Sequence, residues 1–219
     1  MVDGNDIDDL KSRFAEVRRL GEGAEGGTWV GVQPGGECVV LKHVPPARKA
    51  GVARTFELLR ASSSPYLPAV LELIDGIEES AWLVTRFVEG CPLAAGPAPL
   101  QTVLGEIIGV ATALAEIHAL GSHHGDVSAN NVIVTPTGGV VLTDFGQLGN
   151  LGCGTPGFIA PEALRGGGGP GADVFGVGSL LCLRLFGEVP WRRPEQVLAV
   201  EGVAAVRRHL LALAERHGV

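Results

Sequence analysis

The sequence predicts an α+β protein of two lobes, in which a small β-rich lobe with one helix precedes a larger, mainly helical lobe. Short β-type runs separated by Gly-rich and Pro-rich turns occupy residues 14–88, and apolar residues at helical spacing dominate residues 89–219. Residues 1–13, which are rich in Asp, are predicted to form an N-terminal tail. This order predicts two lobes with a cleft between them.

The predicted strands of the first half are rich in β-branched and aromatic side chains, and turn residues bound them. They are residues 28–32, 38–44 and 82–87. A single helix is predicted at residues 52–61, where apolar and charged side chains mix at helical spacing before a Ser-Ser-Ser-Pro loop.

The second half is predicted to be helical, with one hairpin inserted. The predicted helices are residues 100–120, 173–186 and 203–213. Two short apolar runs, residues 131–134 and 140–143, flank a Thr-Pro-Thr-Gly-Gly turn and are predicted to pair as the hairpin.

Composition excludes several classes of partner. The 219 residues include 24 acidic and 17 basic side chains, for a formal net charge of −7. Nucleic acids and anionic membranes bind through an excess of Lys and Arg, so neither is expected as a partner. The apolar run at residues 174–186 is shorter than the ~20 residues of a membrane span. Four dispersed cysteines and an acidic N-terminus favour a reduced, cytoplasmic protein.

A Gly-x-Gly-x-x-Gly segment formed by Gly21, Gly23 and Gly26 could let backbone N–H groups approach a phosphate chain. Dinucleotide-binding folds use the same spacing, but they need an acid ~20 residues later, where this chain has Leu41 and Lys42. No Gly-Lys-Ser/Thr follows, which excludes a P-loop. Lys42 ends a predicted strand, and it is interpreted as a phosphate-binding amine, with an ordinary surface lysine as the alternative.

Three further segments follow in a specific order. They are His-Gly-Asp-Val-Ser-Ala-Asn-Asn at residues 124–131, Asp-Phe-Gly at 144–146 and Gly-Thr-Pro-Gly-Phe-Ile-Ala-Pro-Glu at 154–162. With the Gly-rich segment and Lys42, they have the order and spacing of the protein-kinase motifs. The chain therefore resembles the bacterial-type (eukaryotic-like) serine/threonine protein kinases, as a small member with an abbreviated C-lobe. The resemblance implies a bilobal protein-kinase-like fold.

The resemblance also implies roles for single residues, with ATP and Mg²⁺ as cofactors. Asp126 would act as the base, Asn131 and Asp144 would hold magnesium, Lys42 would hold the α- and β-phosphates, and Thr155 would hydrogen-bond Asp126. A polar turn is the alternative for Asp126 and Asn131. The implied nucleotide-binding residues are Gly21, Gly23, Gly26, Val40, Lys42, Arg86, Val88 and Ile133, and ordinary core packing explains Val40 and Ile133 equally well.

Some positions depart from the kinase pattern. Glu57 is the candidate partner of Lys42 on the single helix of the first lobe, with a solvent-facing charge as the alternative. Glu25, at the tip of the Gly-rich segment, would repel phosphates unless it points outward. Ser128 stands where kinases usually have Lys.

The regulatory and C-terminal regions also depart. Gly125 replaces the Arg that reads a phosphorylated activation segment, so regulation by loop phosphorylation is not expected. Only 28 residues follow Trp191, which implies shortened docking helices and leaves room for an activating or docking partner. Arg207 or Arg208 is expected to pair with Glu162.

The resulting hypothesis is an ATP-dependent phosphotransferase that acts on Ser or Thr of a protein substrate by in-line transfer, with Asp126 as base. One alternative is a pseudokinase that serves as a scaffold or a nucleotide-binding regulatory module. Another is a small-molecule kinase of the aminoglycoside-phosphotransferase type, which shares the His-Gly-Asp loop. The Ala-Pro-Glu segment and the predicted helix at Asp173 argue against the latter.

Overall fold

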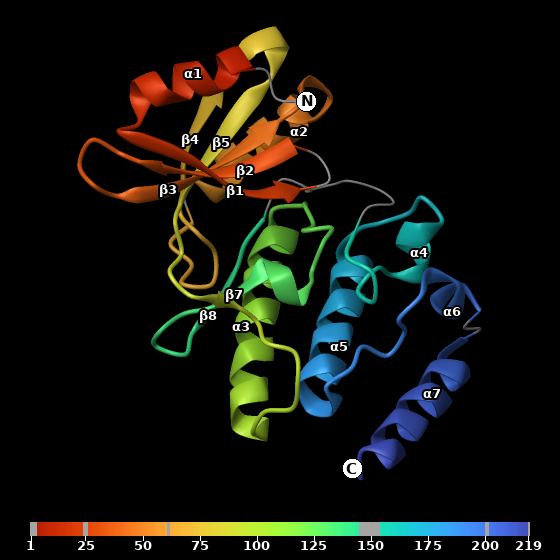
Figure 1. The fold of residues 1–219 in the computed structure, drawn as a ribbon. Coiled ribbons are helices and arrows are strands. Elements are labelled where there is room, and N and C mark those ends of the chain that lie inside the picture. The colour runs from red at the N-terminus through yellow and green to blue at the C-terminus, as the bar shows by residue number, and fades with distance from the viewer. Residues whose placement is uncertain (1–3, 24–25, 61, 145–153, 200–201, 219) are drawn as a thin grey trace. The chain divides into compact units, whose positions relative to one another are not determined.

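The computed structural model describes the chain except residues 1–3, 24–25, 61, 145–153, 200–201 and 219. The chain divides into two compact units, an N-terminal unit (Met1–Val88) and a C-terminal unit (Glu89–Val219). The larger sheet lies in the N-terminal unit and the longest helices lie in the C-terminal unit (Figure 1). This distribution confirms the predicted α+β fold class.

The N-terminal unit is an antiparallel sheet with strand order β1-β2-β3-β5-β4. Its elements are α1 (Gly4–Arg13), β1 (Glu16–Gly23), β2 (Gly26–Val32), β3 (Cys38–Val44), α2 (Pro46–Leu59), β4 (Val70–Asp75), η1 (Ile77–Glu79) and β5 (Ala81–Arg86). Helix α2 begins six residues before the predicted helix, because Pro46 supplies a favourable first helical residue.

Strand β3 has one face in the core of this unit and one face directed away from that core. Val39 and Leu41 are fully buried in a cluster with Leu10, Phe14 and two tryptophans. Since alternate residues of a strand point to opposite faces, Val40 and Lys42 share the face away from this cluster, where both are half-buried.

Residues 4–13, predicted as part of a tail, instead form helix α1, which lies along the sheet (Figure 1). Leu10 is fully buried, and Ile7 packs against the same cluster. Ile7, Leu10 and Phe14 are spaced by three and four residues, which is the pattern of an amphipathic helix. The charged residues between them, Asp8, Asp9, Lys11 and Arg13, obscured that pattern.

The C-terminal unit contains a three-stranded sheet of order β6-β7-β8 and most of the helical residues. Its elements are β6 (Cys91–Pro92), α3 (Leu100–Ala119), η2 (Ala129–Asn131), β7 (Val132–Val134), β8 (Val140–Leu142), α4 (Pro161–Leu164), α5 (Pro170–Phe186), α6 (Pro194–Leu198) and α7 (Gly202–Arg216). Helices α3 and α5 pack side by side, and α3 also contacts β8 (Figure 1).

The apolar run at residues 174–186 is not the segment that best matches a membrane span, because helix α3 is longer. Among the described residues it is the helix whose length and apolar composition would allow it to cross a membrane. The core helix of a folded domain passes the same test, and α3 buries Val103, Val110 and Ile117 within the C-terminal unit. This property is therefore weak evidence for a membrane span.

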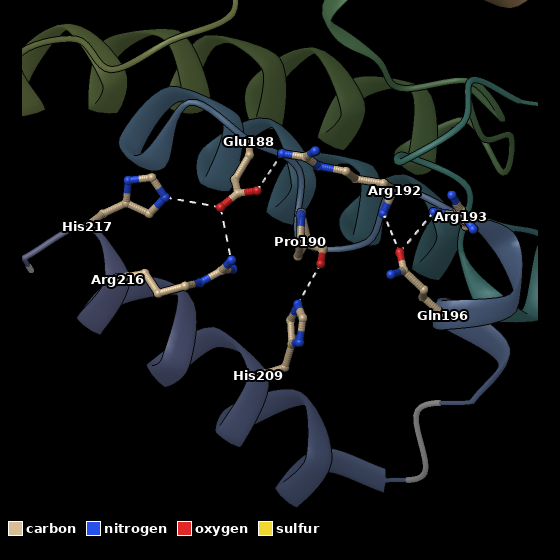
Figure 2. Close-up of polar contacts among 8 residues, drawn as sticks. All are labelled: Glu188, Pro190, Arg192, Arg193, Gln196, His209, Arg216 and His217. Atoms are coloured by element: carbon tan, nitrogen blue, oxygen red, sulfur yellow. Dashed lines mark hydrogen bonds and ion pairs between the residues drawn. The ribbon is translucent and has the colours of Figure 1, made fainter.

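Helix α7 attaches to the segment that follows α5. Trp191 stacks on His209 of α7 at a ring-centroid distance of 5.2 Å and on Phe175 of α5 at 5.5 Å. His209 Nε2 also contacts the carbonyl oxygen of Pro190 (Figure 2). Within the part of the chain that the structure describes, no ion pair joins Glu162 to Arg207 or Arg208, so that expected pairing is not observed.

Glu188 is the charged centre of this attachment. Its carboxylate lies 2.8 Å from Arg192 Nη2, 3.4 Å from Arg216 Nη2 and 3.1 Å from His217 Nε2 (Figure 2). The hydrogen bond to His217, together with the two arginines, lowers the pKa of Glu188 below its ordinary value. Two of these three partners belong to the end of α7 or follow it directly, so Glu188 holds that end of the helix.

The lowered pKa predicts a pH-dependent contribution of Glu188 to stability. A carboxyl group whose folded pKa is below its unfolded pKa stabilises the fold above the unfolded value, about 4.3 for Glu, and loses this effect as pH falls through the folded pKa. At pH values above the unfolded pKa, wild type should therefore melt at a higher temperature than Glu188→Gln, and this difference in melting temperature should shrink as the pH falls below it. Thermal melts across this range measure the difference. The exposed Glu89→Gln is the control, and a constant Glu188→Gln deficit would contradict the prediction.

Candidate active site

The candidate site of the C-terminal unit is built on a buried carboxylate, Asp173, in the first turn of α5. Its Oδ2 accepts the backbone N–H of His124 at 2.8 Å, and its Oδ1 accepts the backbone N–H of Gly125 at 2.8 Å. His118 Nε2, at the end of α3, lies 2.7 Å from Oδ2. One side chain therefore joins α3, α5 and the loop at residues 124–131.

His118 is a positioning residue that the sequence reasoning missed. It lies in the last turn of α3, and its ring reaches Asp173 across 55 residues of sequence. His124, which is fully buried, places its Nε2 2.9 Å from the carbonyl oxygen of Thr143, next to Asp144. The sequence shows His118 shortly before the polar 124–131 loop, but it does not show that the partner of His118 is Asp173, 55 residues later.

Close approach of α5 to the 124–131 loop requires glycine at one position. A Cβ on Gly176 would lie 2.7 Å from Val127 Cβ and 2.8 Å from the carbonyl oxygen of Val127. Since real Cβ atoms do not approach so closely, only glycine lets Asp173 reach the loop backbone while the helix packs against it.

Asp126 is fixed by hydrogen bonds to both of its carboxylate oxygens. Oδ1 accepts the backbone N–H and the hydroxyl of Thr155, each at 2.9 Å. Oδ2 accepts a hydrogen bond of 3.0 Å from Asn131 Nδ2, which also donates to the Asp126 carbonyl oxygen at 2.8 Å. These bonds hold the carboxylate in one orientation.

Asn131 and Asp144 are joined through the residue between β8 and Asp144. The Thr143 N–H and hydroxyl donate to the Asn131 carbonyl oxygen at 2.7 and 3.1 Å. Asp144 has a φ of 74°, a left-handed conformation that is uncommon for non-glycine residues and that Asp adopts more readily than most. The backbone thus brings the two expected metal ligands into one region of the unit.

The donor set fits magnesium. Because Asn131 donates through Nδ2, its amide oxygen is directed away from Asp126, and Asp144 supplies a carboxylate. Mg²⁺ is commonly bound by one or two such oxygens together with substrate phosphates. The described residues contain no cluster of three or more His, Cys, Asp or Glu side chains that could hold a metal by themselves.

A small pocket lies beside Asp126. Asp126, Val127 and Thr155 contribute to its wall, and the remaining lining residues are mostly small or apolar. Those residues are Gly125, Gly154, Phe158, Ile159, Ala160, Ala163 and Ala172. A fixed carboxylate at the edge of a small apolar pocket can orient a hydroxyl group that enters there.

The remaining expected nucleotide residues are distributed over both units. Gly21, Gly23 and Gly26 belong to the β1–β2 hairpin, where Gly21 pairs with Thr28 and Gly23 with Gly26. Ile133 lies in β7, in the C-terminal unit, and is half-buried. Because the hairpin and β7 lie in different units, their convergence on one nucleotide stays a prediction.

The segment expected to face an adenine base lies at the C-terminal end of the N-terminal unit. Arg86 ends β5, and its N–H donates to the carbonyl oxygen of Ala69 at 2.9 Å. Val88 is the last residue of the unit. Glu57 is exposed on α2, and its pairing with Lys42 stays a prediction.

Three residues singled out in the sequence lie outside the described part of the chain. These are Glu25, Phe145 and Gly146. Ser128, which stands in place of the usual Lys, is fully buried, and its hydroxyl has no hydrogen-bond partner among the described residues. It therefore contributes a small buried side chain where kinases usually place a charged amine.

The contacts of Asp173 predict a large effect of a nearly isosteric change. In Asp173→Asn one oxygen becomes an NH₂ group, which cannot accept the backbone N–H now bound to that oxygen. Leaving a buried donor unpaired should lower the free energy of unfolding by about 1–3 kcal/mol, measured by urea denaturation. Amide exchange at His124 and Gly125 should accelerate as well. Asp75→Asn, whose side chain is 87% exposed, is the matched control; equal stability of the two variants would contradict the assignment.

Comparison with known proteins agrees with this geometry. The family model of the protein kinase domain matches residues 14–209. The serine/threonine-protein kinase AfsK of Streptomyces coelicolor is 30% identical over 210 residues, covering 85% of this chain and 26% of AfsK. A Thermomonospora curvata protein named "Probable serine/threonine-protein kinase PkwA" is 27% identical, covering 80% of this chain and 26% of PkwA.

A Caenorhabditis elegans protein named as a tyrosine-protein kinase is 41% identical over 96 residues, covering 39% of this chain and 29% of that protein. The chain thus spans about a quarter of the length of these relatives. The family model covers most of the chain and coincides with the elements that hold Asp126, Asn131 and Asp144. The chain is a protein kinase domain and belongs to the eukaryotic-like serine/threonine protein kinase superfamily.

Proposed function

We propose that this protein kinase domain transfers the γ-phosphoryl group of ATP to Ser or Thr residues of a protein substrate, with Asp126 as the base. The observation that carries the proposal is the orientation of the Asp126 carboxylate, which Asn131 and Thr155 hold at the edge of a small pocket. Phosphoryl transfer depends mainly on positioning and on neutralising phosphate charge. A carboxylate held from two sides suits the task of orienting a hydroxyl and accepting its proton.

The choice of ATP and Mg²⁺ rests on the family and on the donor set. Asn131 and Asp144 would hold Mg²⁺, which neutralises phosphate charge when bound. Lys42, at the half-buried face of β3, would hold the α- and β-phosphates, and the three glycines of the β1–β2 hairpin would let backbone N–H groups approach the phosphates. Val40 and Ile133 would bound the adenine, and the backbone of Arg86 and Val88 would bind its edge.

Preference for Ser or Thr over Tyr is supported by the contacts of Thr155. Its hydroxyl and N–H both bind Oδ1 of Asp126, and this brings the Gly-Thr-Pro-Gly-Phe segment, part of which lines the pocket, close to the carboxylate. A short acceptor side chain is therefore favoured, because a phenol ring needs more room between the peptide backbone and the base. The two bacterial relatives named as serine/threonine kinases agree with this preference.

Two variants separate the roles of the acidic residues. Asp126→Asn should keep Mg·ATP binding and lose transfer, since general-base assistance contributes about 10²–10⁴-fold. Asp144→Asn should lose transfer together with the Mg²⁺ dependence of ATP binding. The measurements are calorimetric ATP binding with and without Mg²⁺, and transfer from γ-labelled ATP to the chain itself and to myelin basic protein.

The exposed Asp75→Asn serves as control, and the labelled amino acids are identified after hydrolysis. Label on Ser or Thr supports the proposal, whereas label on Tyr alone would overturn the assigned specificity. Binding of Mg·ATP by wild type without any transfer would favour the pseudokinase alternative. Wild-type transfer by Asp126→Asn would refute its role as base.

A further inference from the structure

A buried ion pair in the C-terminal unit is not used by the mechanism above. Arg184 of α5 and Glu106 of α3 are 8% and 4% exposed. The guanidinium and carboxylate form a two-point contact, with Arg184 Nε 2.8 Å from Glu106 Oε2 and Nη2 3.1 Å from Oε1. Removing two charges from water is costly, and replacing such a pair by apolar side chains is often neutral or stabilising. Stability alone is therefore a poor account of this pair.

The third nitrogen of Arg184 points to a different element. Nη1 donates to the carbonyl oxygens of Ala94 and Gly96 at 3.0 and 2.7 Å. Both belong to residues 93–98, called here the connector, which runs from β6 toward α3. The backbone of Arg184 also accepts the N–H of Ala98 at 3.1 Å. Glu106 occupies two nitrogens of the guanidinium and so aims the third at the connector.

The first residue of the connector binds the candidate site directly. The N–H of Leu93 donates to the carbonyl oxygens of Val132 at 2.8 Å and Ala129 at 3.1 Å. Ala129 begins η2, the turn that ends at Asn131. Leu93 is buried, so these bonds are shielded from water.

The residues just before the connector hold β7 in the same way. Cys91 and Pro92 of β6 pair with Val134 and Ile133. A Cβ on Gly90 would lie 2.2 Å from the carbonyl oxygen of Val134, so the chain approaches β7 as closely as glycine permits. A displacement of the connector would therefore be passed on to Ile133 and to the turn that carries Asn131.

We infer that Arg184 and Glu106 form a positioning pair, which fixes the connector and through it the nucleotide-facing residues Ile133 and Asn131. This inference rests on the proposed nucleotide site. It makes a specific claim: nucleotide affinity depends on the bonds from Arg184 Nη1 to the connector and does not depend on the ion pair as such.

Two variants give opposite expectations for stability and binding. Arg184→Met with Glu106→Leu fills the core with apolar side chains but removes the bonds to Ala94 and Gly96. It should melt at or near the wild-type temperature and bind Mg·ADP about tenfold more weakly, the change that ~1.4 kcal/mol produces. Glu106→Gln weakens the ion pair but leaves Nη1 bound to the connector. It should melt at a lower temperature and keep nearly wild-type ADP affinity.

A merely structural role would make ADP affinity follow melting temperature in both variants, and that result would overturn the inference. We would measure Mg·ADP binding by calorimetry, melting temperature by thermal melts and amide exchange at Leu93 by NMR. Amide exchange at Leu93 should accelerate only in the double variant. Arg208→Met, at an exposed position of α7 in the same unit, is the control and should change none of them.

Other outcomes are also decisive. If the double variant does not fold, Arg184→Lys replaces it, because a single ammonium group cannot bind Glu106 and both connector carbonyls, and unchanged ADP affinity in that variant would refute the inference. Failure of wild type to bind Mg·ADP would refute the proposed nucleotide site and with it the role of the pair. Intact ADP binding with unchanged Leu93 exchange in the double variant would refute the positioning role alone.

Discussion

The buried carboxylate of Asp173 is the interaction on which the candidate site depends. It is 1% exposed, and it binds two consecutive backbone N–H groups of the 124–131 loop as well as the ring of His118. Burial of a carboxylate raises the free energy of the folded state unless hydrogen bonds compensate it, so each of these three contacts depends on the other two. Because Gly125 is bound in this way, the position and direction of the next residue, Asp126, are determined by the core of the C-terminal unit.

From this anchor the remaining polar contacts follow in sequence. Asp126 is oriented by Asn131 and Thr155, and Asn131 is connected to Asp144 through Thr143. The contact between Asn131 and Asp126 lies within the 124–131 loop, whereas Thr155 and Thr143 each join another segment to that loop. The C-terminal unit therefore holds the proposed base and both expected metal ligands through its own hydrogen bonds.

Much of this site could be predicted from the sequence, because its residues lie in short motifs with fixed spacing. Asp126 and Asn131 are five residues apart in one loop, and the strands that lead to Asp144 have a readable hairpin pattern. The helices α3 and α5 were predicted to within a few residues of their observed bounds, α3 from the spacing of its apolar residues and α5 from its apolar run. Helix α1 was missed because acidic residues separate its few apolar ones.

The pairings over long sequence distances could not be predicted in this way. Glu106 and Arg184 are each a charge among apolar residues of a helix, which signals a buried partner for both, but 78 residues separate them. The spacing of apolar residues within one helix does not show which other helix it packs against. The partner of Lys42 poses a related problem. Glu57 is the only acidic residue of α2, but the sequence does not show whether the packing of that helix on β3 brings Glu57 to Lys42.

A crystal structure of the chain with a non-hydrolysable ATP analogue and Mg²⁺ tests the central claim most directly. The account predicts that Asn131 and Asp144 both bind the metal, that Lys42 contacts the phosphates, and that Asp126 keeps its hydrogen bonds to Thr155 and Asn131 as the analogue binds. A structure in which the analogue binds elsewhere, or in which Asp126 turns away from Thr155 while the metal lies apart from Asn131 and Asp144, would contradict it.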